Sequence, residues 1–181
     1  MEPIYLRALE RDDLERTHKW HNDRTMYRIM GGTFHYVSRA AEEAWLRKKE
    51  AYSPTEVMLA ICVTETSQHI GNIYLRNIDW AARHAEGQIW IGEVGQRTKG
   101  YGRAAAELLI SHAFEDLGLH RLYVLALEGN PSIHMAETQG FVREGVLRDH
   151  VYVAGKFKDL VVLGMTVDDY RRARPRAERG Q

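Results

Sequence analysis

The segment best suited to chemistry runs from Arg97 to Arg103 and reads Arg-Thr-Lys-Gly-Tyr-Gly-Arg. Gly100 and Gly102 let the backbone approach a ligand closely and adopt dihedral angles that other residues avoid. A helix is expected to begin here, and the free N–H groups and dipole of a helix start favour an anion such as a pyrophosphate. The sequence therefore predicts a phosphate-binding loop. The residues assigned to it are Arg97, Lys99, Gly100, Tyr101, Gly102 and Arg103.

Two better-known phosphate loops do not fit this segment. A Walker loop requires Ser or Thr directly after its lysine, whereas Gly100 follows Lys99. A dinucleotide fingerprint requires a third glycine, but Ala105 stands at that position, and the strand-helix unit lies mid-chain and not first. A nucleotide-binding protein that uses these glycines for a different phosphate stays open as an alternative.

Strands and helices must position this loop. Runs of β-forming or alternating residues predict strands at Ile4–Ala8, Val57–Thr64, Ile70–Ile78, Gln88–Val94 and Leu122–Leu127. Apolar spacing and cap residues predict helices over Asp12–Asn22, after Ser38, from the glycine loop to about Leu117, and after Asn130-Pro131. A hairpin is predicted from strands at Arg148–Val153 and Lys156–Val167, joined by a turn at Ala154-Gly155.

Two of these elements carry an expectation about burial. Leu122–Leu127 is apolar on both faces, which favours a strand covered on both sides. The helix after Ser38 is expected to turn one stripe inward. That stripe comprises Ala41, Ala44, Trp45 and Lys48.

Composition and charge limit the class of protein. The chain has 181 residues, a formal net charge of zero and one cysteine, Cys62. One domain over residues 1–167 is therefore predicted, followed by a solvated basic tail over 168–181. No apolar run approaches the roughly 20 residues that span a bilayer, and the N-terminus lacks a signal-peptide pattern. We expect a cytoplasmic protein that binds neither DNA nor membrane, and a homo-oligomer is compatible with the sequence.

Further motifs extend the glycine loop into a longer pattern. Arg97, Gly100 and Gly102 match a Gln/Arg-x-x-Gly-x-Gly/Ala motif, and Asn130–Gly145 contains Asn, Ser and then Glu-x-x-Gly-Phe-x-x-Glu-Gly. In this order the motifs resemble the GNAT acetyltransferase superfamily. The resemblance is narrower to the branch of ribosomal-protein N-terminal, spermidine and amino-sugar-nucleotide acetyltransferases, and it covers nearly all of residues 4–167.

The resemblance implies an α/β (α+β) domain with a mixed, mostly antiparallel sheet of about seven strands flanked by helices. It also implies acetyl-CoA as co-substrate, with the acetyl group beside Ile91 and Gly92 and with Asn130 contacting the cofactor. The family often places a tyrosine proton donor where this chain has Ala136. Ser132 is then the nearest hydroxyl in a matching position, and it is the predicted donor to the departing thiolate.

Fewer features of the sequence point to the site that binds the acceptor amine. An alkylamine has a pKa near ~10 and must lose a proton before it attacks, so a base is needed. Glu93, at the end of the predicted strand, is the candidate base, and Trp20 and Asn22 are candidates to line the amine site. His18 and His21 lie three residues apart without further ligands at metal spacing, so we expect a surface pair and no metal site.

The sequence thus predicts an enzyme that moves an acetyl group from acetyl-CoA to a primary amine by direct attack. A protein N-terminus, a polyamine and an amino sugar all stay open as acceptors. Direct attack needs no cysteine nucleophile, and Cys62 is expected to be buried in its strand. The main alternative is a non-catalytic acyl-CoA-binding or sensor module.

Overall fold

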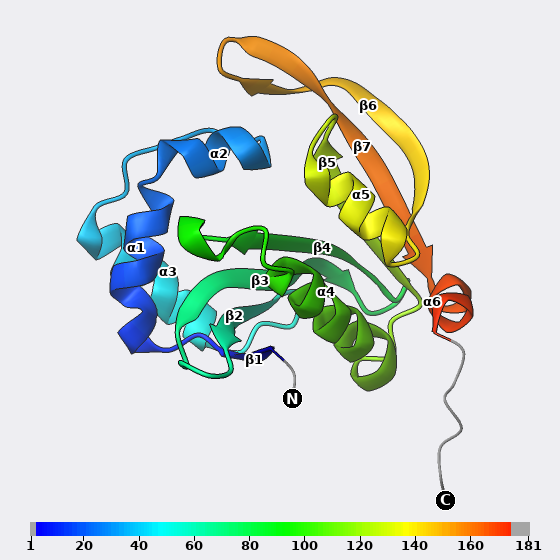
Figure 1. Ribbon diagram of the computed structural model, residues 1–181, viewed down its shortest axis with the longest axis horizontal. Coiled ribbons are helices and arrows are strands. Elements are labelled where there is room, and N and C mark those ends of the chain that lie inside the picture. The colour runs from blue at the N-terminus through cyan, green and yellow to red at the C-terminus, as the bar shows by residue number, and fades with distance from the viewer. Residues whose placement is uncertain (1–2, 175–181) are drawn as a thin grey trace, which may run out of the picture.

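Within residues 3–174, which the computed structural model describes, seven strands form one sheet (Figure 1). Their order is β1-β2-β3-β4-β5-β7-β6, and every neighbouring pair is antiparallel except β4 and β5. The strands are β1 Ile4–Ala8, β2 Val57–Val63, β3 His69–Asp79, β4 His84–Ile91, β5 Arg121–Leu127, β6 Val142–Val153 and β7 Lys156–Thr166. The predicted fold class is confirmed.

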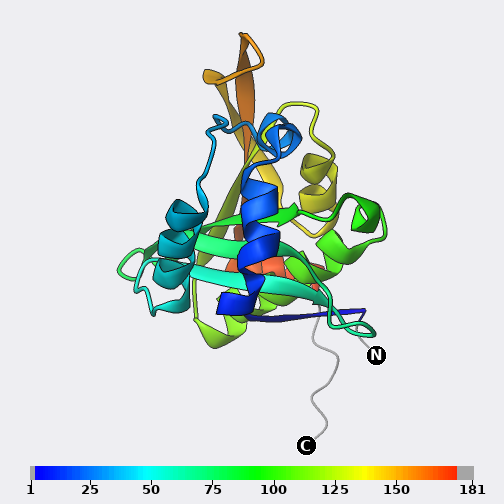
Figure 2. The same cartoon turned by 90° about the vertical axis from the view of Figure 1, so that its left-hand side faces the viewer.

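Helices cover both faces of this sheet (Figures 1 and 2). The α-helices are α1 Leu14–His21, α2 Arg24–Met30, α3 Arg39–Glu50, α4 Tyr101–Ser111, α5 Pro131–Thr138 and α6 Val167–Ala173. Trp20 of α1 and Met26 of α2 pack with Trp90 of β4 on one face, while Gly102 of α4 lies against Ile89 and Ile91 on the other. The first three helices therefore share one face, and α4 and α5 lie across the sheet from them.

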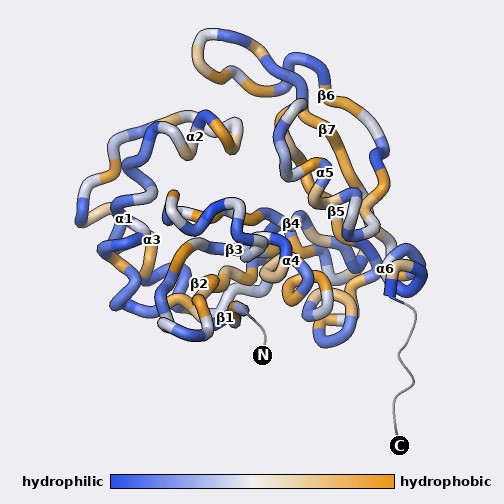
Figure 3. Tube along the Cα trace, viewed as in Figure 1, coloured by the Kyte–Doolittle hydropathy of each residue, from blue (hydrophilic) through white to orange (hydrophobic). Residues whose placement is uncertain are grey.

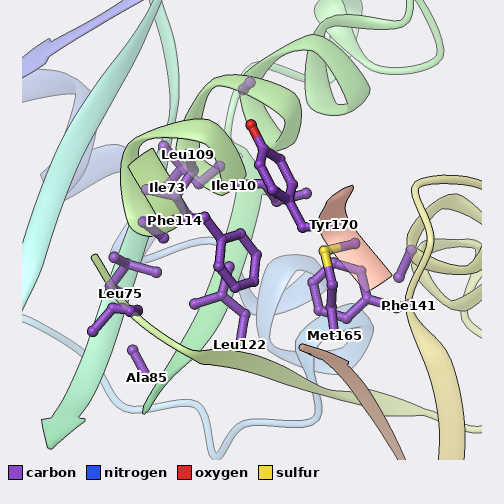
Figure 4. Close-up of a cluster of buried hydrophobic side chains, with 14 of the residues drawn as sticks. Ile73, Leu75, Ala85, Leu109, Ile110, Phe114, Leu122, Phe141, Met165 and Tyr170 are labelled. Carbon is purple, nitrogen blue, oxygen red and sulfur yellow. The ribbon is translucent and has the colours of Figure 1, made fainter. Parts of the chain in front are cut away.

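The main core lies between the sheet and α4. Figure 4 shows Leu109 and Phe114 lying among side chains of β3 and β5, and the hydropathy of the trace rises in the same strands (Figure 3). Leu75 and Leu122 are at most 1% exposed. The α4 helix continues through a π turn at His112–Asp116. This packing fixes the first turn of α4 against the end of β4.

Two predicted caps start helices as expected. Ser38 Oγ accepts a hydrogen bond from Ala41 N at 3.2 Å at the start of α3, and Asn130 Oδ1 accepts one from Ser132 N at 2.9 Å at the start of α5. A side-chain oxygen at this position satisfies an N–H group that lacks a partner within the helix. The helix α2 had not been predicted; it ends at Gly31, whose φ of +79° suits glycine.

Several boundaries and faces differ from the prediction. The third central strand is His84–Ile91 and not Gln88–Val94, so Glu93 lies beyond its end. In α3 the buried residues are Glu42 and Leu46, because the Glu42 carboxylate contacts His21 inside the protein, whereas Ala41, Ala44 and Lys48 are exposed. The β6 strand begins at Val142, six residues before the predicted hairpin strand.

The boundary of the basic tail also differs. Residues Val167–Ala173 form α6, which starts with a capping box between Thr166 and Asp169. Tyr170 is buried and stacks on Phe114 with ring centroids 4.9 Å apart. The domain therefore extends to at least residue 173, because this aromatic pair fastens the helix to α4. The predicted tail residues Arg176 and Arg179 lie outside the described part of the chain.

The sheet divides after Glu86. The parallel pairing of β4 with β5 comprises three residue pairs, of which Glu86 with Tyr123 is the last. The next residues of β4 continue to pair with β3, but none of them pairs with β5 in the described structure. Residues Tyr123–Ala126 of β5 are accordingly half-buried. The prediction that this strand is buried on both faces is correct only for Leu122 and Leu127. The backbone of β4 after Glu86 is thus free on one edge.

Candidate functional site

The glycine loop leads from the end of β4 into α4. Gly100 has a φ of +82° and is the N-cap of the helix, and no side chain in residues 3–174 caps this helix start. The N–H groups of Tyr101, Gly102 and Arg103 occupy the first turn, where a helix offers no acceptor. The loop therefore presents several unpartnered donors together with the positive end of the α4 dipole.

Gly102 has no structural need to be glycine. A Cβ built there would meet Ile89, Ile91 and Met135 at 3.8–4.0 Å, which is ordinary van der Waals contact, and its φ is not in the left-handed region. The chain itself could hold a side chain at this position. The missing side chain instead leaves room directly above the first turn of α4, as a bound pyrophosphate requires.

The charged side chains of the loop are not equivalent. Arg97 Nε donates to Ile91 O at 3.0 Å, and its guanidinium also contacts the sulfur of Met26. Arg97 therefore fastens the loop to the end of β4, and its predicted contact with the cofactor stays a prediction. Lys99 Nζ bonds Gln96 Oε1 at 3.0 Å, and Arg103 pairs with Glu107 at 3.1 Å with both side chains largely exposed. Exposed partners exchange readily, so Lys99 and Arg103 stay accessible to an anion.

On α5 the predicted residues Asn130 and Ser132 separate into two roles. The Asn130 side chain caps α5 through its oxygen and donates from Nδ2 to Ile29 O at 2.9 Å. One N–H of its amide therefore joins α2 to α5, and its contact with a cofactor stays a prediction. The Ser132 side chain is half-buried, and its hydroxyl has no hydrogen-bond partner among residues 3–174. That hydroxyl is available to a ligand.

Glu93 and Trp20 form a connected pair beside the end of β4. Trp20 is 1% exposed, and its Nε1 donates to Glu93 Oε1 at 3.0 Å, while Lys19 Nζ lies 3.1 Å from the same oxygen. Burial raises the pKa of Glu93, but the hydrogen bonds from Lys19 and Trp20 outweigh it and hold the pKa below its usual value. This carboxylate is ionised and engaged, which makes it a weaker proton acceptor than the sequence suggested.

The Asn22 side chain makes three hydrogen bonds within the protein. Its Nδ2 donates to His18 O and Val37 O, both at 3.0 Å, and its Oδ1 accepts from Val37 N at 3.1 Å. These bonds clamp the segment between α2 and α3 onto the end of α1. The amide therefore shapes this wall of the site and uses both of its N–H donors within the protein, and its contact with an amine stays a prediction.

His21 was not predicted as a functional residue. Its Nδ1 lies 2.8 Å from Glu42 Oε2 and 3.0 Å from Oε1, and the Glu42 side chain is 1% exposed. The two predicted surface histidines are thus both engaged, since His18 Nε2 lies 2.8 Å from Val37 O. No group of three potential metal ligands occurs in residues 3–174. No spacing rule links positions 21 and 42, so the pair was invisible in sequence.

Two surface cavities lie away from the end of β4. The larger, about 590 Å³, is lined by charged residues of α3 and of the turn before α1, including Arg39 and Glu43. The smaller, about 190 Å³, lies between α2 and the tip of the β6–β7 hairpin and includes Arg24, Tyr27 and Tyr152. Neither contains the glycine loop, so the site defined above rests on its backbone and side-chain geometry.

A split mixed sheet, with an uncapped glycine-led helix beside the free strand edge, defines an acyl-CoA-dependent acyltransferase. Comparison with known families agrees: the Acetyltransferase (GNAT) domain matches residues 4–142. The chain belongs to this family, which confirms the resemblance noted in the sequence.

Similar proteins have related descriptions. A spermidine N(1)-acetyltransferase of Vibrio cholerae is 33% identical over 161 residues, covering 87% of this chain and 89% of that protein. The putative ribosomal N-acetyltransferase YdaF of Bacillus subtilis is 42% identical over 92 residues, about half of each chain. The crystal structure of Vibrio cholerae spermidine N-acetyltransferase with CoA and spermine has a TM-score of 0.86 at 27% identity, covering 94% of this chain and 99% of that one.

These findings confirm the predicted reaction class. The protein is an acetyl-CoA-dependent N-acetyltransferase that acts on amines. In the described part of the chain, none of the helices combines the length and apolar character needed to cross a membrane.

Proposed function

We propose that acetyl-CoA binds with its pyrophosphate on the first turn of α4 and its pantetheine along the free edge of β4. The observation that carries this proposal is the loss of β4–β5 pairing after Glu86, in a strand that leads through residues 92–100 to a helix start whose N–H groups lack caps. An extended pantetheine can then pair with β4 as an added strand would. Lys99 and Arg103 supply the charge, and Tyr101 flanks them.

At the end of this edge lies the proposed acetyl position, beside Ile91 and Gly92. A backbone N–H there would donate to the thioester oxygen as negative charge develops on it. The neutral amine forms a bond to the carbonyl carbon, the bond to sulfur breaks, and the sulfur leaves as a thiolate. The Ser132 hydroxyl, which is unpartnered within residues 3–174, is the proposed donor to that sulfur. Trp20 and the loop held by Asn22 are the proposed walls of the amine site.

A polyamine is the proposed acceptor. Support comes from the spermidine acetyltransferases, which match this chain over nearly its whole length and not only in the cofactor-binding half. An amine that carries an anionic group is a second candidate. The carboxylates on this face already have partners, Glu42 in His21 and Glu86 in Arg76, whereas Arg24 and Arg28 line the small cavity beside α2.

Thiol release from acetyl-CoA across a panel of amines tests both acceptors. Spermidine, spermine, an amino-sugar nucleotide and a peptide with a free N-terminus should be compared at equal concentration. We expect the polyamines to give the highest kcat/KM. Turnover confined to the amino-sugar nucleotide or peptide would reject the polyamine, and Arg28→Ala would then lower kcat/KM for that acceptor. No thiol release with any amine would favour the non-catalytic sensor. A cytoplasmic location is part of the proposal, since acetyl-CoA is an intracellular metabolite.

A further inference from the structure

The pair formed by His21 and Glu42 stands beside the proposed acceptor position. Glu42 is fully buried, and its carboxylate meets His21 Nδ1 at 2.8 and 3.0 Å. A carboxylate only accepts hydrogen bonds, so Nδ1 carries the proton and donates it to Glu42. The other ring nitrogen, Nε2, then holds a lone pair. It has no partner among residues 3–174, and the side chain is 15% exposed.

The ring of His21 is fixed in place from two sides. It lies edge-on to Trp45 of α3 at 4.6 Å and against Trp90 of β4 at 5.1 Å between centroids. Trp90 lies near the end of β4 and Gly92 directly follows the strand; positions two residues apart in extended backbone share a face and lie about 7 Å apart. Trp20, the neighbour of His21 on α1, packs directly on Gly92. The imidazole thus lies within reach of one or two waters of the proposed acetyl position.

Two buried donors on the same face lack acceptors. Trp90 Nε1 and Asn72 Nδ2 are buried without a hydrogen-bond partner in the described structure, and Asn72 pairs across the strands with Trp90. Buried N–H groups without an acceptor are rare in native proteins. Because Trp90 contacts the ring of His21, its unpartnered Nε1 indicates that a polar atom of solvent or ligand belongs near this point, as a proton path from the amine would require.

We propose that His21 is the general base of the acetyl transfer and that Glu42 is its positioning residue. The proposal rests on the proposed function. The acceptor arrives as an ammonium ion and gives one proton to His21 Nε2, directly or through water. The free amine then attacks the carbonyl carbon, the carbon–sulfur bond breaks, and the second nitrogen proton passes to the leaving sulfur. The imidazolium, held beside the Glu42 carboxylate, finally releases its proton to solvent.

Other titratable groups around His21 do not take this role. Lys19 on the same helix pairs with Glu93 beyond β4, and His18 Nε2 is engaged by Val37 O. Tyr27 of α2 is kept protonated, since burial first and the charge of Glu42 second raise its pKa above the usual value. Of these groups only the imidazole of His21 has a ring nitrogen with a free lone pair, since its other nitrogen is taken by Glu42.

The test is the pH dependence of kcat/KM for wild type and His21→Asn, with the acceptor that gives turnover. Asparagine keeps an N–H for Glu42 but has no basic nitrogen. We expect kcat/KM to fall about 100-fold at pH 7 with unchanged CoA affinity. The defect should shrink with rising pH, because the fraction of free amine increases toward its pKa near ~10. A merely structural residue would lower kcat/KM equally at every pH.

Two further variants complete the design. In Glu42→Gln the acid limb of the pH profile should move to lower pH, because the imidazolium loses its counter-charge; this variant carries the test if His21→Asn does not fold. His112→Asn is the control, since it removes an exposed histidine–carboxylate pair, His112 with Asp116 at 2.7 Å, in the helical turn that follows α4. It should retain wild-type kcat/KM.

The possible outcomes distinguish a failure of the His21 assignment from a failure of the proposed function. If wild type transfers acetyl groups and a folded His21→Asn variant matches it at all pH values, the base assignment is wrong and the proposed function stands. If wild type transfers an acetyl group to no amine, the proposed function and the dyad are both rejected.

Discussion

The indole of Trp20 lies so close to Gly92 that a Cβ at position 92 would overlap its ring. The same indole donates to Glu93, one residue further along the chain. One side chain of α1 therefore holds two consecutive residues at the end of β4. This contact joins the acceptor wall to the strand along which acetyl-CoA is proposed to lie.

Gly92→Ala should displace Trp20 and lower stability by about 1–3 kcal/mol, because overpacking a buried site forces side chains or backbone to shift. It should also reduce kcat by disturbing the acetyl position. Urea unfolding checks the first effect. Gly87→Ala in the same strand is the stability control, since its Cβ would meet Val124 at an ordinary 3.5 Å. Equal stability losses in the two variants would contradict the close contact.

Gly102→Asp should weaken CoA binding at least ~100-fold, because the new carboxylate would occupy and repel the pyrophosphate. The chain itself has room for a side chain here, so the fold should survive. Calorimetric titration with CoA measures the effect. Gly145→Asp is the matched control, because a Cβ there meets nothing within 4 Å and the residue lies on β6. Unchanged affinity in a folded Gly102→Asp variant would reject the loop assignment.

Ser132→Ala should lower kcat ten- to a hundredfold while CoA affinity stays nearly unchanged, since a donor to the leaving sulfur acts mainly in the transition state. The helix cap comes from Asn130, so stability should change little. Thr138→Ala on the same helix removes a hydroxyl that bonds Met135 O and serves as control. A wild-type kcat in Ser132→Ala would leave the hydroxyl without a catalytic role.

Cys62→Ala should retain most of the acetyl transfer. The thiol is fully buried in β2, and burial raises its pKa above the usual value, so it is neither accessible nor nucleophilic. Loss of a small buried side chain should cost about 1 kcal/mol of stability. Mass spectrometry of enzyme quenched during turnover provides the check. An acetylated Cys62 together with an inactive variant would contradict direct attack.

Asp13→Asn should lower stability by about 3 kcal/mol at pH 7, because it removes one partner of a buried ion pair. Burial raises the pKa of Asp13, but bonds from Arg7 and His69 outweigh it and hold the pKa well below the usual value. An aspartate whose pKa is lowered by folding stabilises the protein at any pH above its pKa in the unfolded chain, about 3.9. This stabilisation is lost as the pH falls through the lower pKa of the folded protein. Urea unfolding from pH 7 to pH 2 should therefore show wild type and variant converging in acid.

Local sequence patterns were sufficient to predict the structure where a residue acts on its neighbours in the chain. Asn130 caps the helix that follows it, and the glycine loop leads into α4, because both effects depend on adjacent backbone. Side-chain partners distant in sequence were not predictable. The engagement of Glu93 by Lys19, of Asn22 by Val37 and of His21 by Glu42 depends on how α1 packs against other elements. For this reason the sequence suggested Glu93 as the base, whereas the structure led us to propose His21.

The three-residue parallel strip between β4 and β5 also has a consequence for assembly of the molecule. The strands β1 to β4 follow one another across one half of the sheet, and β5, β7 and β6 form the other half from a later part of the chain. The proposed acetyl position lies at the end of β4 in the first half, whereas Ser132, the proposed donor to sulfur, lies on α5, which connects strands of the second half. The proposed site therefore depends on the contact between the two halves, and a substitution far from the reacting atoms that weakens the β4–β5 pairing should lower the rate of acetyl transfer.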